Sequence, residues 1–213
     1  MIIAAEHEVS IWLERATSYR FFSLYFRLPT EEVSAELAAL AAEVSSELRE
    51  LAKMRQQLTL EECAQEFHRV LGAGGIPACA SSYDDNALAG RGPMLADISG
   101  FYQAFAYRPE PPPAEVPDHL AVELDFLSYL AVKVAFALHE GCQDEAEIAR
   151  RACEQFLTEH LHEWTERFHL RLEQSASPIY IQASMHLRKL LSSQSASRAD
   201  ATAPNRRCGS PCR

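Results

Sequence analysis

The sequence predicts an all-α protein, because apolar residues recur at helical spacing along most of the chain while strand signals are nearly absent. The length of 213 residues suits one domain with its own hydrophobic core. We expect a single helical domain over residues 1–192, with about eight to eleven helices in two groups. An N-terminal group (about 6–106) and a C-terminal group (118–192) are joined by a Pro-rich hinge (107–117), and residues 193–213 form a disordered tail.

The first predicted helix ends at Pro29, because a proline inside a helix removes a hydrogen bond and clashes with the preceding turn. Its apolar side consists of Ile11, Trp12, Tyr19, Phe22 and Phe26. Thr30 can then cap a second helix, whose first turn places Glu31 and Glu32 at the positive end of the helix dipole. This Ala-, Leu- and Glu-rich helix is expected to run to about Gln56.

A capping box opens the third predicted helix, with Thr59 as the N-cap and Glu62 three residues later, and Gly72 ends it. Its apolar residues are Leu60, Cys63, Ala64, Phe67, Val70 and Leu71. Residues 72–92 are rich in glycine and polar residues and are expected to form a long loop, a kind of segment that often carries function. Pro93 opens the next helix. The apolar side of that helix contains Met94, Ile98, Phe101, Tyr102 and Phe105.

Five of the eleven residues from Tyr107 to Pro117 are proline, so this segment is expected to be extended. A helix follows at once, with an apolar stripe of Leu120, Leu124, Leu127, Ala131, Val134 and Leu138. The stripe is widened by Val122, Phe126, Leu130 and Phe136. A helix with so wide an apolar surface is expected to be central and buried on most sides.

The helices after the central one have less distinct start and stop signals in the sequence. Asp144 and Glu147 indicate a capped start for the helix after the central one. Its helical pattern falters at residues 158–160, where we expect a break. The pattern then resumes through Leu161, Trp164, Phe168 and Leu172. Pro178 begins a last helix that is expected to end near Leu191.

The formal net charge of −10 disfavours nucleic acid as the main partner, because phosphate binding needs a cationic surface. No apolar stretch reaches the ~18 residues that a membrane-spanning helix needs. The N-terminus lacks the pattern of a secretion signal, so we expect a cytoplasmic protein without stable membrane insertion. The six cysteines form no C-x-x-C pair and are expected to be free thiols, including Cys208 and Cys212 in the predicted tail.

Asp118 and His119 stand side by side where the Pro-rich segment turns into the central helix. Asp118 is predicted to be the N-cap of that helix. This leaves His119 unexplained, because the helix dipole disfavours a protonated histidine in a first turn. Glu115, Asp118 and Glu123 are near enough in sequence to offset that penalty. A histidine among carboxylates can be a general base, a metal-site member or a hydrogen-bond donor, so capping, catalysis and recognition stay open at this point.

Enzymatic chemistry finds little support in the sequence. There is no G-x-S-x-G turn, and "GAGG" at 72–75 is too short for a phosphate-binding loop. The strongest enzymatic alternative is a di-iron carboxylate bundle, since Glu159-x-x-His162 and Glu166-x-x-His169 match its ligand pairs. Both pairs lie within eleven consecutive residues, whereas such sites draw them from facing helices. We therefore expect these histidines on a solvated helix face, and no metal or cofactor.

Several stretches share their order and residue types with one family of proteins. They are "EFHRVLG" (66–72), Pro77 followed by Ser82-Tyr83, "ADISGFYQAFAY" (96–107), "EVPDHLAVELDFLSYL" (115–130) and "FLTEHLHEWTERF" (156–168). In these features the chain resembles the TorD/DmsD/NarJ family of redox-enzyme maturation chaperones over roughly residues 10–191. Asp125 and Leu127 replace the family's usual Glu and Met, and Ala80 stands where many members carry an acidic residue.

The resemblance implies a non-catalytic chaperone that binds the twin-arginine leader and the apo form of a molybdenum-containing oxidoreductase of the DMSO reductase class. Such a chaperone assists cofactor insertion and delays export. An acidic protein suits a leader in which arginines precede an apolar segment. The residues then expected to bind the peptide are Glu115, Pro117, Asp118, His119, Glu123, Leu71, Pro77, Tyr83 and Tyr25. A di-iron enzyme and a purely structural helical adaptor stay as alternatives, and both a monomer and a domain-swapped dimer stay open.

Overall fold

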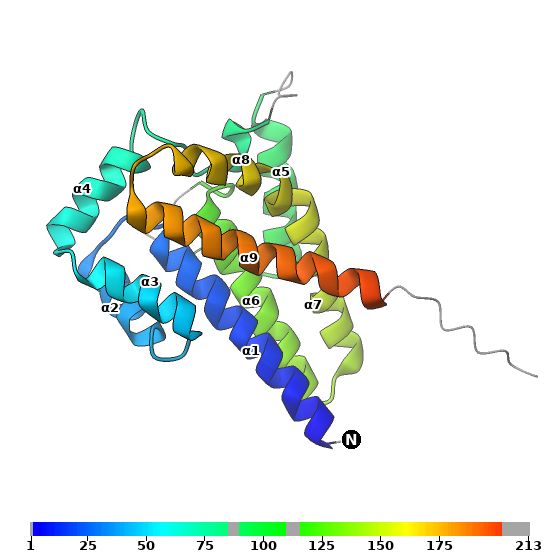
Figure 1. The fold of residues 1–213 in the computed structure, drawn as a ribbon. Coiled ribbons are helices and arrows are strands. Elements are labelled where there is room, and N and C mark those ends of the chain that lie inside the picture. Colours follow the sequence, from blue (N-terminus) through cyan, green and yellow to red (C-terminus); the bar gives the residue numbers. More distant parts are fainter. Residues whose placement is uncertain (1, 85–89, 110–115, 202–213) are drawn as a thin grey trace, which may run out of the picture.

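The computed structural model describes residues 2–84, 90–109 and 116–201 (Figure 1). Glu115, most of the predicted hinge and the end of the predicted tail lie outside the described residues. Within the described ranges the secondary structure is helical, and the only strand-like feature is an isolated bridge between Cys79 and His119. The all-α class is therefore confirmed for this part of the chain, whereas the hinge stays a prediction.

The helices follow one another with short connections, apart from the long segments on either side of α5. They are α1 (Ile2–Tyr25), α2 (Glu31–Leu40), α3 (Ser46–Gln56), α4 (Leu60–Val70), α5 (Gly92–Ala104), α6 (Leu120–His139), α7 (Gln143–Phe156), α8 (His162–Glu173) and α9 (Pro178–Ala201). A short 3-10 helix, η1 (Ala80–Ser82), precedes α5, and a π-helical turn, η2 (Leu157–Leu161), joins α7 to α8. No helix of the described chain is both long and apolar enough to cross a membrane.

The central helix of the fold is α6, and α1 packs along it in the antiparallel direction (Figure 1). The hydroxyl of Ser23 donates to the carbonyl of Ala121 at 2.7 Å, and that of Ser128 donates to the carbonyl of Ala16 at 2.9 Å. One hydrophobic core contains residues from both predicted groups, and α7 covers α6 as well. The central helix is buried along most of its length as predicted, but Val132 and Phe136 are 47% and 65% exposed in its C-terminal half.

Local sequence signals place several helix ends as predicted. At the start of α2, Thr30 Oγ1 accepts the N–H of Val33 at 3.1 Å. At the start of α4, the hydroxyl of Thr59 accepts the N–H of Glu62 at 3.2 Å. The carboxylate of Glu62 accepts the N–H of Thr59 at 2.7 Å, which completes the predicted capping box. Pro93 lies in the first turn of α5, where its missing N–H leaves no helical hydrogen bond unmade.

The prediction of one long second helix is wrong, because the chain forms two helices there. Ser45 caps α3 by accepting a backbone N–H of its first turn at 3.4 Å. Arg49 stabilises the break between the helices. Its guanidinium donates to three carbonyl oxygens, those of Ala41, Ala42 and Val44, at 3.0, 3.2 and 3.3 Å. Carbonyls at a helix end lack helical partners, so this arginine supplies the missing donors.

The C-terminal helices differ from prediction at three points. The N-cap of α7 is Cys142 without a side-chain hydrogen bond, and Asp144 lies inside the first turn instead of capping it. The expected break at residues 158–160 is the π-helical turn η2, so the helix widens there and does not end. The last helix continues past Leu191 to Ala201, because the intervening residues include no glycine or proline that would stop it.

Asp125 of α6 joins four segments of the chain. It accepts hydrogen bonds from the guanidinium of Arg20 on α1 and, at 2.7 Å, from the hydroxyl of Tyr107. Arg27 lies 3.5 Å away on its other side. Arg20 also donates to Glu36 of α2 at 2.7 and 2.9 Å. Because Asp125 is only 8% exposed, these partners must compensate for its lost hydration.

We predict that Asp125→Asn lowers the free energy of unfolding by about 2–3 kcal/mol, because two partly buried guanidinium groups lose their anion. Urea denaturation followed by far-UV circular dichroism measures this loss. Glu50→Gln, which breaks an exposed ion pair with Lys53, is the control and should leave the midpoint unchanged. Equal midpoints for the two variants would show that the Asp125 cluster contributes little to stability.

Candidate functional site

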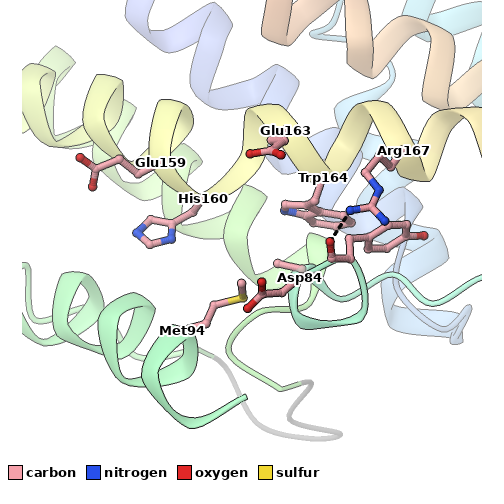
Figure 2. A pocket seen from close by; sticks show the side chains of 9 residues that line it. Asp84, Met94, Glu159, His160, Glu163, Trp164 and Arg167 are labelled. Carbon is pink, nitrogen blue, oxygen red and sulfur yellow. Dashed lines mark hydrogen bonds between the residues drawn. The ribbon is translucent and has the colours of Figure 1, made fainter. Parts of the chain in front are cut away.

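A pocket of about 170 Å³ lies between the loop around η1, the start of α5 and the chain that runs from η2 into α8 (Figure 2). Its lining residues are Ala80, Tyr83, Asp84, Met94, Glu159, His160, Glu163, Trp164 and Arg167. The lining contains three carboxylates, one guanidinium and two large aromatic rings. The pocket therefore combines an acidic rim with apolar surface.

The π-helical turn η2 contributes the acidic side of the pocket. Figure 2 shows Glu159, His160, Glu163 and Arg167 along the same stretch of η2 and α8, with Arg167 reaching the loop that carries Asp84. A π-helical turn accommodates an extra residue, so every side chain that follows it is rotated relative to the preceding helix. Such turns are frequent at functional sites, and this one joins two helices without a loop.

His160 of η2 is held in an apolar setting at the edge of the pocket. Its side chain is 7% exposed, and its ring centroid lies 5.2 Å from that of Phe101 and 4.8 Å from that of Phe156. Burial lowers the pKa of His160 below its ordinary value, and the nearby Asp97 and Glu159 oppose this only in part. Its Nε2 atom lies 3.4 Å from Oδ2 of Asp97. The imidazole is therefore largely neutral at neutral pH.

An aromatic pair, Tyr83 of the loop and Trp164 of α8, forms another wall. The ring of Tyr83 lies 5.5 Å from that of Trp164, and its hydroxyl donates to the carbonyl of Pro77 at 2.9 Å. Arg167 donates to the backbone carbonyl of Tyr83, and the guanidinium of Arg171 stands 4.8 Å above the tyrosine ring. These contacts hold Tyr83 from both its backbone and its side chain, so this wall is preformed.

The junction of Asp118 and His119 lies behind this wall. Asp118 is 1% exposed, and its carboxylate accepts the N–H of Ser81 at 2.9 Å. Its backbone carbonyl accepts the N–H of Ala80, also at 2.9 Å. The prediction that Asp118 caps the central helix is wrong, because the N-cap is His119, whose Nδ1 accepts the N–H of Ala121 at 3.2 Å. Asp118 instead positions the loop that supplies Ala80 to the pocket.

Glu123 lies one helical turn further along α6 and is fully buried. Burial, and then the charge of Asp118, raises the pKa of Glu123 well above its ordinary value. The indole N–H of Trp164 is near enough to favour the charged form, but neither group makes a hydrogen bond of ordinary geometry. An unpaired carboxylate in this position is most stable with its proton attached, so Glu123 is neutral where other carboxylates are charged.

Residues 36–169 match the protein family described as the nitrate reductase delta subunit. The chain belongs to this family. A selenate reductase assembly chaperone protein from Thauera selenatis is 34% identical over 134 residues, which are 62% of this chain and 68% of that protein. A chlorate reductase assembly chaperone protein from Ideonella dechloratans is 32% identical over 115 residues, which are 53% of this chain and 58% of that protein. The second match thus spans less than two thirds of its relative.

A solved structure described as a redox enzyme maturation protein from Archaeoglobus fulgidus shares the fold. It has a TM-score of 0.61 and 22% sequence identity, and the match covers 83% of this chain and 93% of that one. Membership of the delta-subunit family confirms the resemblance to the TorD/DmsD/NarJ chaperones. The two sequence relatives are named as assembly chaperones and not as catalysts, in agreement with the prediction that this family member is not an enzyme.

The predicted peptide-binding residues occupy different places in this delta-subunit family member. Tyr83 lines the pocket, whereas Tyr25 is fully buried in the core beneath the guanidinium of Arg55. Leu71 and Pro77 are partly exposed but do not line it. The carbonyl of Pro117 accepts the hydroxyl of Tyr102 at 2.8 Å, so Pro117 helps to hold the segment before α6. Direct contact of these residues with a peptide stays a prediction.

Sequence reasoning did not identify the acidic side of the pocket. Glu159 and Glu163 lie in the stretch where the helical pattern falters, and that irregularity was the available signal. The di-iron alternative pointed to the same stretch for another reason. The expectation that we preferred to it, histidines on a solvated helix face, is wrong for His169. That residue is buried, with Nδ1 2.8 Å from Oγ of Ser184. Among the described residues no cluster of three or more His, Cys, Asp or Glu side chains could hold a metal ion.

Asp118→Ala and Asp118→Asn test whether the buried carboxylate positions the pocket loop. The alanine variant leaves the N–H of Ser81 without an acceptor and should lower the free energy of unfolding by about 1–3 kcal/mol. The asparagine variant keeps an oxygen acceptor, so its free energy of unfolding should fall by less. Hydrogen exchange at Ser81 and urea denaturation measure both effects. Equal exchange rates in wild type and Asp118→Ala would contradict the positioning role.

Glu123→Gln tests the buried neutral carboxylate. Because folding raises the pKa of Glu123 above 4.5, wild-type stability should fall as the pH rises from that value toward the raised pKa. The glutamine variant has no proton to lose. Its free energy of unfolding, relative to that of wild type, should therefore rise by up to about 1.4 kcal/mol for each pH unit in this window. Urea denaturation at several pH values measures the difference. A difference that does not change with pH would show that the group titrates normally.

Proposed function

We propose that the protein is a cytoplasmic chaperone for the assembly of an oxidoreductase. Its sequence relatives are named as assembly chaperones of selenate reductase and of chlorate reductase, which supports an oxidoreductase client here. The proposed client is a molybdenum-containing enzyme of the DMSO reductase class. The chaperone binds its apo form and its twin-arginine leader, assists cofactor insertion and delays export until insertion is complete.

The observation that carries the leader-binding part of this proposal is the acidic side of the pocket. Glu159 and Glu163 lie on the same stretch of η2 and α8 and line the pocket together. The only hydrogen-bond donor to Glu159 among the described side chains is the neutral amide of Gln155, at 3.1 and 3.2 Å. No hydrogen bond or ion pair joins Glu163 to another residue in the described part of the chain. Both carboxylates can therefore accept the planar N–H fork of an arginine.

The rest of the pocket suits the same ligand. Tyr83 and Trp164 form a mostly buried aromatic wall, and Arg171 already stands over the Tyr83 ring, so the carboxylates are the proposed contacts for the guanidinium of the ligand. A neutral His160 adds no positive charge that would repel the ligand. The pocket loop takes its position from Asp118, so the acid–histidine junction contributes to recognition by supporting the aromatic wall. Glu115, for which a direct contact with the leader was predicted, lies outside the described residues.

Isothermal titration calorimetry with a synthetic twin-arginine leader peptide tests the proposal. Wild type should bind the peptide, and the double variant Glu159→Gln/Glu163→Gln should bind it about tenfold more weakly, because two charge-assisted hydrogen-bonding partners become neutral. Affinity should also fall as the salt concentration rises, since the contacts are electrostatic. Replacing both arginines of the peptide by lysine should weaken binding, because lysine cannot make the two-pronged contact.

A second double variant controls for net charge. Glu43→Gln/Glu61→Gln removes the same number of charges from exposed positions outside the pocket and should bind like wild type. Circular dichroism and thermal melting of both variants check that each is folded. Failure of the wild-type protein to bind the peptide, or equal weakening by the two double variants, would overturn leader binding at this pocket.

A further inference from the structure

Resting on the proposed function, we propose that the groove between α5 and α7 binds the apolar segment that follows the arginines of the leader. The groove encloses about 470 Å³. Its apolar surface comes from Gly100, Phe101, Ala104, Phe105, Ile148 and Ala152. Ile148 is 61% exposed, an unusual position for a large β-branched side chain on a helix that is otherwise polar on its outer side.

The groove adjoins the acidic pocket, because residues that line one hollow contact a residue that lines the other. Asp97 lines the groove, and its carboxylate lies 3.4 Å from Nε2 of His160, which lines the pocket. The ring of Phe101 belongs to the groove and lies 5.2 Å from the ring of His160. The same imidazole therefore forms part of the boundary between the two hollows. A ligand that fills the pocket can pass over this boundary directly into the groove.

The charges at the groove also fit an apolar occupant. Arg151 is engaged by Glu147 at 2.6 Å, and Gln155 by Glu159. The remaining charged side chain of the lining, Asp97, stands next to His160 at the boundary with the pocket, so the surface left for a ligand around Gly100, Phe105 and Ile148 is apolar. A basic segment in the pocket and an apolar segment in the groove match the order of a twin-arginine leader. The leader would run from the pocket toward the C-terminal end of α5.

The length of the groove limits how much of the leader it can hold. From Asp97 to Phe105 the helix rises about 12 Å, at about 1.5 Å per residue. This length suits about eight leader residues in a helix, or about four in an extended conformation. A second apolar groove, lined by residues that include Met54, Leu58 and Ile179, is formed by α3, α4 and the start of α9, none of which lines the acidic pocket. It therefore serves as a control surface.

Gly100 offers a direct way to block the groove. A Cβ atom built there meets no other atom within 4 Å, and the backbone is helical, so a larger side chain can extend into open space. Gly100→Trp should fill the groove. Gly100→Ala should leave it open while favouring the helix. Gln65→Trp places the same bulky group on α4 beside the control groove.

The experiment compares two synthetic peptides by calorimetry. Both begin with the same arginine pair, which is followed in one by about eight leucine and alanine residues and in the other by about eight serine and glycine residues. Wild type should bind the apolar peptide at least about tenfold more tightly than the polar one. Gly100→Trp should reduce this ratio to within about twofold, while Gly100→Ala and Gln65→Trp should keep the wild-type ratio.

A second pair of variants keeps the test decisive if Gly100→Trp does not fold. Ile148→Ser removes exposed apolar surface inside the groove, and Leu170→Ser removes it at a 55% exposed position outside. Only Ile148→Ser should reduce the ratio. If neither peptide binds wild type, the proposed function itself fails. If both peptides bind equally, or if Gly100→Trp keeps the wild-type ratio, the groove inference fails while the acidic pocket stands. Sedimentation of both proteins without peptide gives one further check. A wild-type dimer that becomes a monomer in the Gly100→Trp variant would also overturn the inference, because a second copy of the chain would then cover the groove.

Discussion

The candidate site depends on the way in which two distant stretches of backbone are joined. The N–H of Ala80 binds the carbonyl of Asp118 at 2.9 Å, and the N–H of Leu120 binds the carbonyl of Ala78 at 2.8 Å. The carboxylate of Asp118 also accepts a hydrogen bond from the N–H of Ser81. Buried loop amides need such partners, because they have left water and belong to no helix. Since α6 is buried along most of its length, the loop that carries Tyr83 is attached to a helix of the core.

The acidic side chains differ in their burial and in the partners that contact their carboxylates. Asp125 is buried among two arginines and a tyrosine that contact its carboxylate, whereas Glu123 is buried without such partners, and burial raises its pKa. Glu159 and Glu163 are exposed at the pocket and have no cationic partner among the described residues. Negative charge is therefore available to a ligand only where water can still reach it. This arrangement avoids the cost of burying unpaired charge and leaves the pocket acidic.

Features governed by local chemistry were predictable from the sequence. The Thr30 cap, the capping box at Thr59 and the proline at the start of α5 follow from neighbouring residues alone. The break before Ser45 was not predictable in this way, because it depends on Arg49 reaching back to the end of α2. The π-helical turn and the burial of Asp118 likewise depend on tertiary packing. Periodicity located the disturbance at η2, but it could not show which side chains would face a pocket.

A sequence motif can either hold the backbone in place or contact a ligand, and the buried position of the acid–histidine junction indicates the first role. Asp118, His119 and Glu123 give the chain its most distinctive resemblance to the chaperone family, yet all three are buried behind the pocket. A buried, hydrogen-bonded set of this kind constrains the backbone, and few other residues satisfy the same bonds. Glu159 and Glu163, which line the pocket, are under no such constraint, because they are exposed to solvent. Chaperones that share the junction can therefore present different charges and surfaces at the pocket. On the proposed function, selection of a client would fall to η2, α8 and the neighbouring groove.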